Sequence, residues 1–262
     1  MHYKKSQVTI FILIGIVISI ILIIFIYQKT YETKIPKVNY YDLDTNKVQF
    51  FIQKCVDETA KNSVIYVSKE GAYYDNLELS IFYPSYIGER IPIWVIPGTV
   101  NIPNYTTLKN SLVDYVKDNL ESCVSVGLSK FSNEGYNIET GEIEADVIIK
   151  ETSVIFNLNY PIKIKKGDKT SEISKFSSII NVELSKMFNI ATEIAKSQIE
   201  DPTWLPISLI TEIAIDENIN FEIELFEEGV IIHLIKENSS LLEPYEFSFA
   251  VGYNETMLKE RE

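Results

Sequence analysis

Residues 143–164 read IEADVIIKETSVIFNLNYPIKI and determine the fold class. Apolar and polar side chains alternate over residues 143–150, and the alternation resumes over residues 154–160 after a short polar turn. Alternation with a period of two places apolar side chains on one face of a strand and polar ones on the other. The pattern continues beyond Pro161 into residues 162–164. The stretch therefore predicts an antiparallel meander with one solvent-exposed face.

Four helices are predicted around this meander, because apolar side chains recur every three or four residues. They cover about Asn46–Glu70, Thr106–Cys123, Ser171–Glu200 and Ile207–Ala214. The longest of them places Ile173, Phe176 and Ile180 on one face. Pro202 stops this helix, since proline cannot continue the hydrogen-bonding pattern.

The remaining apolar runs predict further strands. Phe221–Phe226, Val230–Lys236 and Tyr245–Val251 form a second meander. Leu79–Tyr83 and Ile91–Ile96 have prolines inside or beside them, which favours edge strands because proline donates no ladder hydrogen bond. The whole pattern predicts an α+β fold in which amphipathic helices pack on antiparallel β-meanders. It leaves open whether the two meanders form one sheet or two.

The N-terminus predicts a transmembrane helix. Val8–Tyr27 contains no charged residue, and a helix of that length spans about 30 Å, the thickness of a bilayer core. A secretory signal peptide would have a shorter apolar region and a cleavage site of small residues. A buried core helix would carry polar residues every few positions. Lysines flank the run on both sides, so charge alone does not decide the orientation.

The chain is thus divided into a basic tail with its transmembrane helix, residues 1–34, and an α+β domain, residues 35–262. Residues 38–128 and 129–262 are candidate subdomains. The formal charge is −13 for the chain, and −16 for residues 35–262 because residues 1–34 carry +3. A protein this acidic, with its acidic residues spread along the domain, is not expected to bind nucleic acid, which requires a basic face.

The residues before the predicted span carry a more specific pattern. Lys4-Lys5-Ser6-Gln7, followed by the apolar run, resembles the class III signal of archaeal type IV pilin-like proteins. The resemblance implies cleavage between Ser6 and Gln7 and a domain outside the cytoplasm. Pilins have a glutamate at the fifth mature position, where this chain has Phe11. The departure argues against a major filament subunit, because that carboxylate pairs with a neighbouring subunit inside the membrane.

Over most of its length the chain resembles an uncharacterised family of archaeal single-span membrane proteins. The resemblance rests on KKSQVTIFILIG at 4–15, Gly71-Ala72-Tyr73, Asn159-Tyr160-Pro161, Phe247-Ser248-Phe249-Ala250 and the two cysteines. It implies a single-pass protein of the cell membrane with its C-terminal domain outside the cytoplasm.

Cys55 and Cys123 fall on the apolar faces of two different predicted helices. In an exterior domain they can form a disulfide, and closing a loop of about 70 residues stabilises a fold by about 4 kcal/mol in the chain-entropy model. The alternative is a pair of buried free thiols. We predict the disulfide.

No catalytic, cofactor or metal site is predicted. The two histidines are His2, in the N-terminal tail, and His233, in an apolar strand where we expect it to be packed. They cannot supply the ligands of a zinc site or the base of a histidine triad. Glu142, Glu144 and Asp146 alternate on one strand face. They lack the loop of a calcium site and are expected to be solvated.

Asn104, Asn238 and Asn254 begin glycosylation sequons that an exterior domain could use, although three is close to the number expected by chance. We expect a non-catalytic binding or assembly module, related to the cell surface or to pili, that is anchored in the bilayer through Val8–Tyr27 and binds a protein partner. The alternative is a membrane-tethered ectoenzyme that hydrolyses glycans or peptides with two carboxylates. The oligomeric state stays open.

Overall fold

The computed structural model describes residues 43–75, 80–82, 90–200, 205–226, 229–237 and 245–252. They belong to one compact unit, Leu43–Glu262. The predicted span and the predicted cleavage site at Ser6 and Gln7 lie outside the described residues. Within the described ranges, no helix combines the length and the apolar character needed to cross a membrane.

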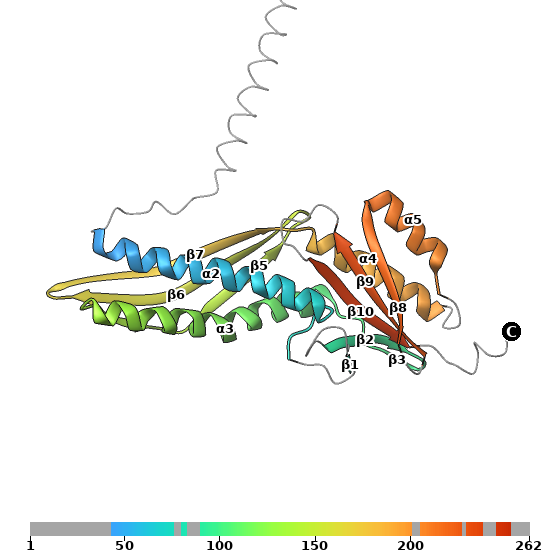
Figure 1. Ribbon diagram of the computed structural model, residues 1–262, viewed down its shortest axis with the longest axis horizontal. Helices are drawn as coiled ribbons and strands as arrows, with labels where there is room; N and C mark the ends of the chain where they lie inside the picture. The colour runs from blue at the N-terminus through green and yellow to red at the C-terminus, as the bar shows by residue number, and fades with distance from the viewer. Residues whose placement is uncertain are drawn as a thin grey trace, which may run out of the picture. The chain divides into compact units, whose positions relative to one another are not determined.

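The described part of the chain is an α+β fold, as the sequence predicts (Figure 1). The helices are α2 (Leu43–Lys69), α3 (Tyr105–Asn133), α4 (Leu184–Glu200) and α5 (Ile207–Glu217). The strands are β1 (Ser80–Phe82), β2 (Arg90–Ile96), β3 (Thr99–Val100), β4 (Asn137–Thr140), β5 (Glu144–Ile149), β6 (Ser153–Lys166), β7 (Lys169–Asn181), β8 (Ile219–Phe226), β9 (Val230–Glu237) and β10 (Glu246–Gly252).

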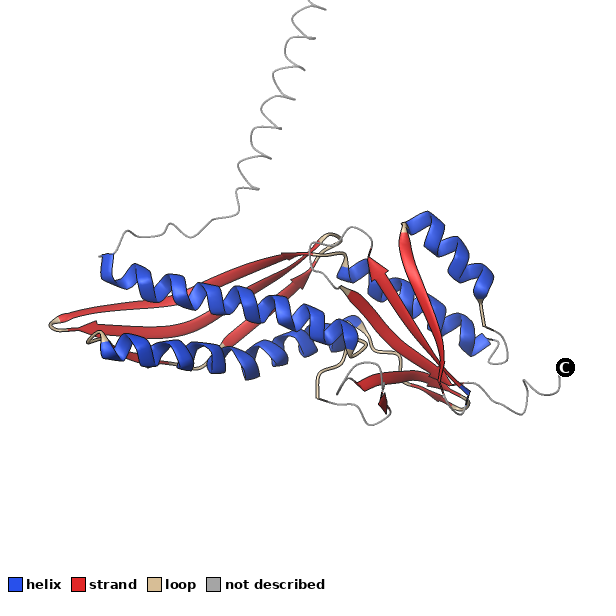
Figure 2. Cartoon of the chain, in the orientation of Figure 1, coloured by secondary structure: helices blue, strands red, loops and turns tan. Residues whose placement is uncertain are grey.

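The first meander forms a sheet of its own, the hairpin sheet, which consists of β4, β5, β6 and β7. The central strand β6 pairs with β7 on one side and with β5 and β4 in succession on the other, always antiparallel. Helices α2 and α3 run along the hairpin sheet (Figure 2). The alternating residues of β6 from Val154 to Ile164 are buried in the same core as the apolar faces of both helices, so the predicted meander is confirmed.

The predicted helix Ser171–Glu200 is wrong over its first half. Residues 169–181 form β7, and α4 begins at Leu184. The turn Gly167-Asp168 folds β7 back on β6, with Gly167 at a φ of +59° that suits a two-residue hairpin turn. The apolar positions that satisfied a helical spacing also fit a strand, since Phe176, Ser178 and Ile180 alternate on its buried face. Pairing along the whole of β6 overrides the local pattern.

The second meander belongs to a separate sheet, the mixed sheet, which consists of β1, β2, β3, β8, β9 and β10. Strands β8, β9 and β10 are antiparallel, as predicted. The prediction of an edge strand at Ile91–Ile96 is wrong, because β2 lies between β1 and β10 and runs parallel to β10. Pro92 is accommodated because it faces the short strand β1, whereas pairing with β10 begins at Ile93.

Helix α3 is longer than predicted and continues past Cys123 to Asn133. Its added turns are packed: an added Cβ on Gly127 would lie 1.9 Å from the Phe51 ring of α2, so this glycine lets the two helices approach closely. In the mixed sheet, Trp94 stacks on Phe249 with ring centroids 4.7 Å apart and contacts Phe188 of α4. Both sheets therefore contribute to one continuous core.

Candidate functional site

The predicted disulfide is present. Cys55 of α2 and Cys123 of α3 are bonded, with their Cα atoms 5.8 Å apart. Cys55 is buried on the apolar face of α2, so the bridge joins the two helices beside the hairpin sheet. The two cysteines are 68 residues apart in the sequence, and their bond is a structural link without an accessible thiol.

Of the three predicted glycosylation sequons, one lies in the described chain. Asn104 is exposed and caps α3, since its side-chain oxygen accepts a hydrogen bond from the Thr107 backbone amide at 2.9 Å. Asn238 and Asn254 lie outside the described residues, as do Ser6 and Gln7.

His233 is packed, as the sequence predicts. Its ring is fully buried and stacks on Phe249 with centroids 4.8 Å apart, and Nε2 lies 3.4 Å from Gln198 Nε2. Burial lowers the pKa of His233 to about 3, so the ring is neutral at physiological pH. It lies in the core and away from solvent, which does not suit a catalytic base.

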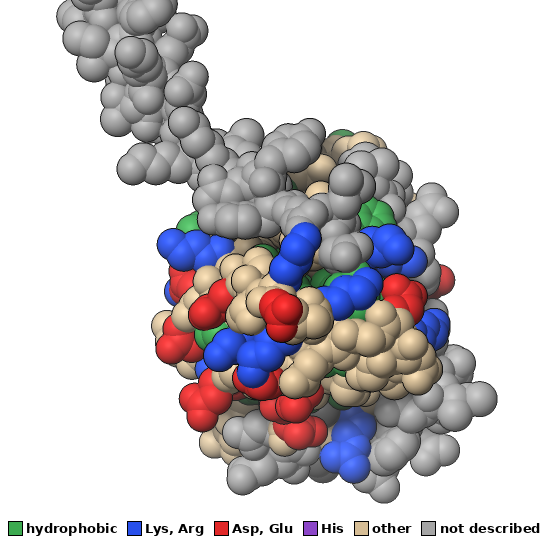
Figure 3. All heavy atoms as spheres, turned by 90° about the vertical axis from the view of Figure 1, so that its left-hand side faces the viewer, with side chains coloured by type: hydrophobic (Ala, Val, Ile, Leu, Met, Phe, Trp, Pro, Cys, Tyr) green, Lys and Arg blue, Asp and Glu red, His purple; other side chains and the backbone are tan. Residues whose placement is uncertain are grey.

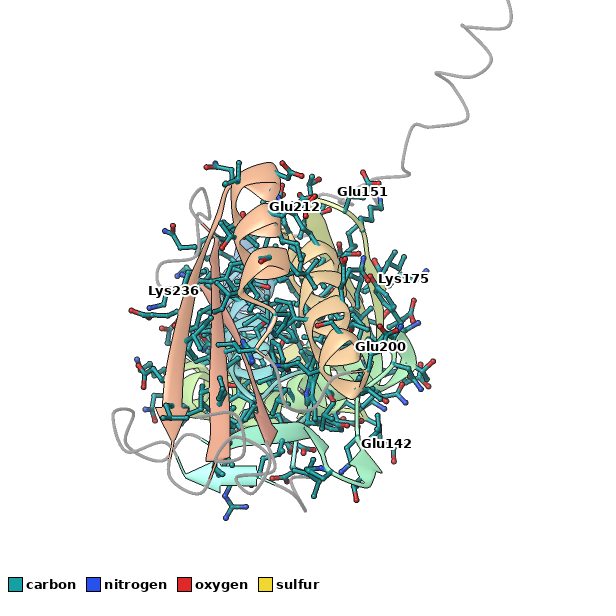
Figure 4. The ribbon with its side chains drawn as sticks, turned by 90° about the vertical axis from the view of Figure 1, so that its right-hand side faces the viewer. Glu142, Glu151, Lys175, Glu200, Glu212 and Lys236 are labelled. Atoms are coloured by element: carbon teal, nitrogen blue, oxygen red, sulfur yellow. A yellow bond between two sulfur atoms is a disulfide. The ribbon has the colours of Figure 1, made fainter. Side chains whose placement is uncertain are left out.

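The acidic residues are dispersed over several elements. Figure 4 shows Glu142, Glu151, Glu200 and Glu212 pointing outward from separate parts of the chain. Asp146 is exposed and forms an ion pair of 2.7 Å with Lys109 of α3. Among the described residues, no group of histidine, cysteine, aspartate and glutamate side chains could hold a metal ion.

Three tyrosines form the clearest candidate binding surface, which we call the tyrosine cluster. Tyr66 belongs to the last turns of α2, Tyr74 to the loop that follows, and Tyr115 to α3. Their ring centroids are 5.8 Å apart for Tyr66 and Tyr74, 5.2 Å for Tyr66 and Tyr115, and 5.4 Å for Tyr74 and Tyr115. Tyr66 is 38% exposed, so the cluster reaches the surface.

The turn after α2 fixes the position of Tyr74. Gly71 and Ala72 both have a positive φ, of +52° and +71°, and the Ala72 amide donates to the Val67 carbonyl at 2.8 Å. This reverses the chain at the helix end. The neighbouring Tyr73 hydroxyl then donates to the Asn101 carbonyl at 2.8 Å and fastens the loop.

Three carboxylates, those of Glu70, Asp75 and Asp118, act on the hydroxyl groups of the cluster. Burial, followed by the charges of Glu70 and Asp75, raises the pKa of Tyr66 to about 12. Burial also raises the pKa of Tyr74, and Asp118 adds to the increase, while a hydrogen bond of 3.3 Å from Asn119 opposes it. All three rings therefore stay protonated near neutral pH, next to carboxylates that favour a positive charge nearby.

This arrangement suits a cationic ligand. The faces of aromatic rings attract ammonium and guanidinium groups, and adjacent carboxylates strengthen that attraction. The cluster could not be predicted from the sequence, because its three tyrosines come from three segments that only the fold brings together. The adjacent Tyr73-Tyr74 pair directly after the helix end was the only local signal.

A second polar group links α4, α5 and β9. Lys186 forms ion pairs with Glu183 at 3.0 Å and with Glu217 at 3.1 Å. Burial raises the pKa of the nearby Glu237 carboxyl, and the Glu183 charge adds to this, although the Glu183 backbone amide donates to that carboxyl. The Glu237 carboxyl, whose pKa is raised, thus lies close to the ion pair of Glu183 with Lys186.

No protein-family model, curated protein sequence or solved structure matches the chain.

Proposed function

We propose that the chain is a membrane-anchored extracytoplasmic protein whose domain is a non-catalytic binding or assembly module, related to the cell surface or to pili. The tyrosine cluster with its surrounding carboxylates carries the proposal. A positively charged segment of a partner protein is the ligand that this chemistry fits best, and the charge of −16 on residues 35–262 favours its approach.

The disulfide supports the proposed location. Disulfides persist in oxidising compartments and are rare in most cytoplasmic proteins. Cys55 and Cys123 are bonded within the core, and no free cysteine is found among the described residues. The predicted span Val8–Tyr27 and the class III-like start are consistent with this location.

A cross-linking experiment tests the binding site. A photoreactive phenylalanine analogue replaces Tyr66 in the full chain, and a control carries it at Leu225, which is 79% exposed on β8. In native membranes we expect a discrete protein adduct from position 66 alone. Mass spectrometry should place the cross-link in a lysine- or arginine-rich segment.

A charge variant and a change of salt concentration distinguish binding that depends on charge from mere proximity. Asp75→Asn with Asp118→Asn should lower the adduct yield, and so should raising the salt concentration, which screens the attraction. Equal adducts from positions 66 and 225, or a yield that ignores both charge and salt, would contradict the proposed binding mode.

The location has a separate test. Asp168 lies in an exposed turn, so Asp168→Cys offers a thiol to a membrane-impermeant maleimide. Intact cells should label this variant as fully as lysed cells do. Labelling that requires lysis would place the domain in the cytoplasm.

The raised pKa of Glu237 favours one alternative, a carboxylate-dependent ectoenzyme that hydrolyses glycans or peptides. Such a glycosidase requires a protonated acid and a second free carboxylate. In the described part of the chain, Glu183 and Glu217 are both paired with Lys186, so neither is free to act as that second group, and this reading ranks below the binding module. Hydrolysis that is lost in a folded Glu237→Gln variant would reverse the ranking.

A further inference from the structure

The tip of the β6–β7 hairpin is basic in an otherwise acidic domain. Residues 163–169 read KIKKGDK, with four lysines and one aspartate, whereas residues 35–262 carry a net charge of −16. The tip comprises the end of β6, the turn Gly167-Asp168 and the start of β7.

The lysines are held on a defined scaffold. Lys166 lies 4.1 Å above the Tyr136 ring, and Lys165 forms an ion pair of 2.7 Å with Glu139 of β4. Lys166 and Lys169 face each other as register partners across the hairpin. The paired strands thus hold several positive charges close together at the tip.

The tip lies at the end of the domain where the chain enters it from residue 42. Figure 1 shows the start of α2 and the turn between β6 and β7 at the same end. A row of ring contacts links them: Phe51 of α2 packs on Phe131 at 5.7 Å, and Phe131 packs on Tyr136 at 5.9 Å, beneath Lys166.

The predicted span ends at Tyr27, so only residues 28–42 separate it from α2. Fully extended, a segment of this length reaches at most about 50 Å, and as a flexible chain it averages about 20 Å. The end of the domain that carries the tip is therefore confined near the bilayer surface, if the chain is anchored as proposed.

Figure 3 views this end of the molecule. Lysine and arginine side chains lie among acidic and polar ones, and hydrophobic side chains show in small patches. Glu139, Asp168 and Glu172 are the acidic residues of the hairpin tip and its partner strand, and Glu139 is already paired with Lys165. A surface of this kind fits contact with headgroups better than insertion into the hydrocarbon core.

We propose that the hairpin tip, through Lys163, Lys165, Lys166 and Lys169, docks on the anionic phosphate headgroups of the membrane that anchors the chain. This inference rests on the anchoring in the proposed function. The contact fixes the orientation of the domain on the bilayer, in addition to the covalent tether.

The test uses the full chain in lipid nanodiscs. Asp168→Cys carries a fluorophore at the tip, and a quencher is attached to the lipid headgroups. Nanodiscs contain either phosphatidylcholine alone or about 30% phosphatidylglycerol. Quenching should be about twofold stronger with the anionic lipid in dilute salt, and this difference should vanish at high salt.

Matched charge variants complete the experiment. Replacing Lys163, Lys165, Lys166 and Lys169 with glutamine should abolish the lipid dependence. Replacing the exposed lysines Lys61, Lys117, Lys150 and Lys196 should preserve it. Circular dichroism and the mass change on reduction verify that each variant keeps its fold and its disulfide.

Two failures are distinguishable. Equal quenching with both lipids, or an effect shared by both sets of lysine variants, overturns the tip contact while leaving the anchoring intact. A chain that does not co-elute with the nanodiscs contradicts the anchoring, and the tip contact with it.

Discussion

At the scale of single residues, Gly71 shows how closely the helix end is packed. A Cβ at this position would lie 2.5 Å from Pro92 Cγ and 2.7 Å from the Ser248 carbonyl oxygen, and its φ of +52° disfavours any other residue. We predict that Gly71→Ala lowers the free energy of unfolding by about 3 kcal/mol, from the left-handed backbone and the overpacking together.

Gly167→Ala is the matched control, because Gly167 has a φ of +59° but nothing within 4 Å of the added Cβ. It should lose only the backbone contribution, about 1 kcal/mol. Urea unfolding followed by tryptophan fluorescence compares the two variants. Equal losses would show that the contacts of Gly71 with β2 and β10 do not limit the packing there.

A second prediction at this scale concerns the pH dependence of stability that His233 causes. Its pKa is lowered from 6.5 to about 3 by burial, so below pH 6.5 the unfolded chain binds a proton that the folded chain excludes. The contribution of the neutral His233 ring to the free energy of unfolding is therefore fully present above pH 6.5. It falls as the pH decreases toward 3, by about 1.4 kcal/mol per pH unit. His233→Phe should remove this slope between pH 5 and 6.5, a window above most carboxylate titrations. An unchanged slope in chemical denaturation would assign the effect to other groups.

At the scale of elements, the disulfide ties α2 to α3. Closing a loop of this length stabilises a fold by about 4 kcal/mol in the chain-entropy model. We predict that Cys55→Ala with Cys123→Ala lowers the urea midpoint as much as reductant does in the natural chain, and that reductant then has no further effect on the variant. A midpoint that reductant leaves unchanged in the natural chain would contradict a stabilising bridge.

The elements also show which patterns could be predicted from sequence. β6 was predictable because its alternation from Val154 to Tyr160 fits a strand and no helix. β7 was not, because Ile173, Phe176 and Ile180 follow a helical spacing, whereas only Phe176 and Ile180 follow the period of two, and pairing with β6 decided between them. The cysteines were predictable because each lies on the apolar face of a long helix. The tyrosine cluster was not, since its rings meet only after α2 and α3 have packed together.

At the scale of the whole molecule, α2 runs between the two proposed contact sites. Its first residue is Leu43, where the chain comes from the predicted span, and Tyr66 lies near its last turn. At 1.5 Å per residue these positions are about 35 Å apart along the helix. A domain that rests its basic tip on the membrane would thus present its acidic tyrosine cluster to a partner well away from the lipid surface.

The intact mass of the protein from native membranes tests this arrangement as a whole. We predict a chain that lacks residues 1–6, as the class III-like start implies, and that gains about two daltons on reduction of its disulfide. Added glycan mass would further support an exterior domain and would direct attention to Asn104, whose side chain is exposed at the start of α3. A chain of full length with no gain on reduction would contradict both the processing and the oxidising location. The same acidic domain would then have to find its basic partner on the cytoplasmic side of the membrane.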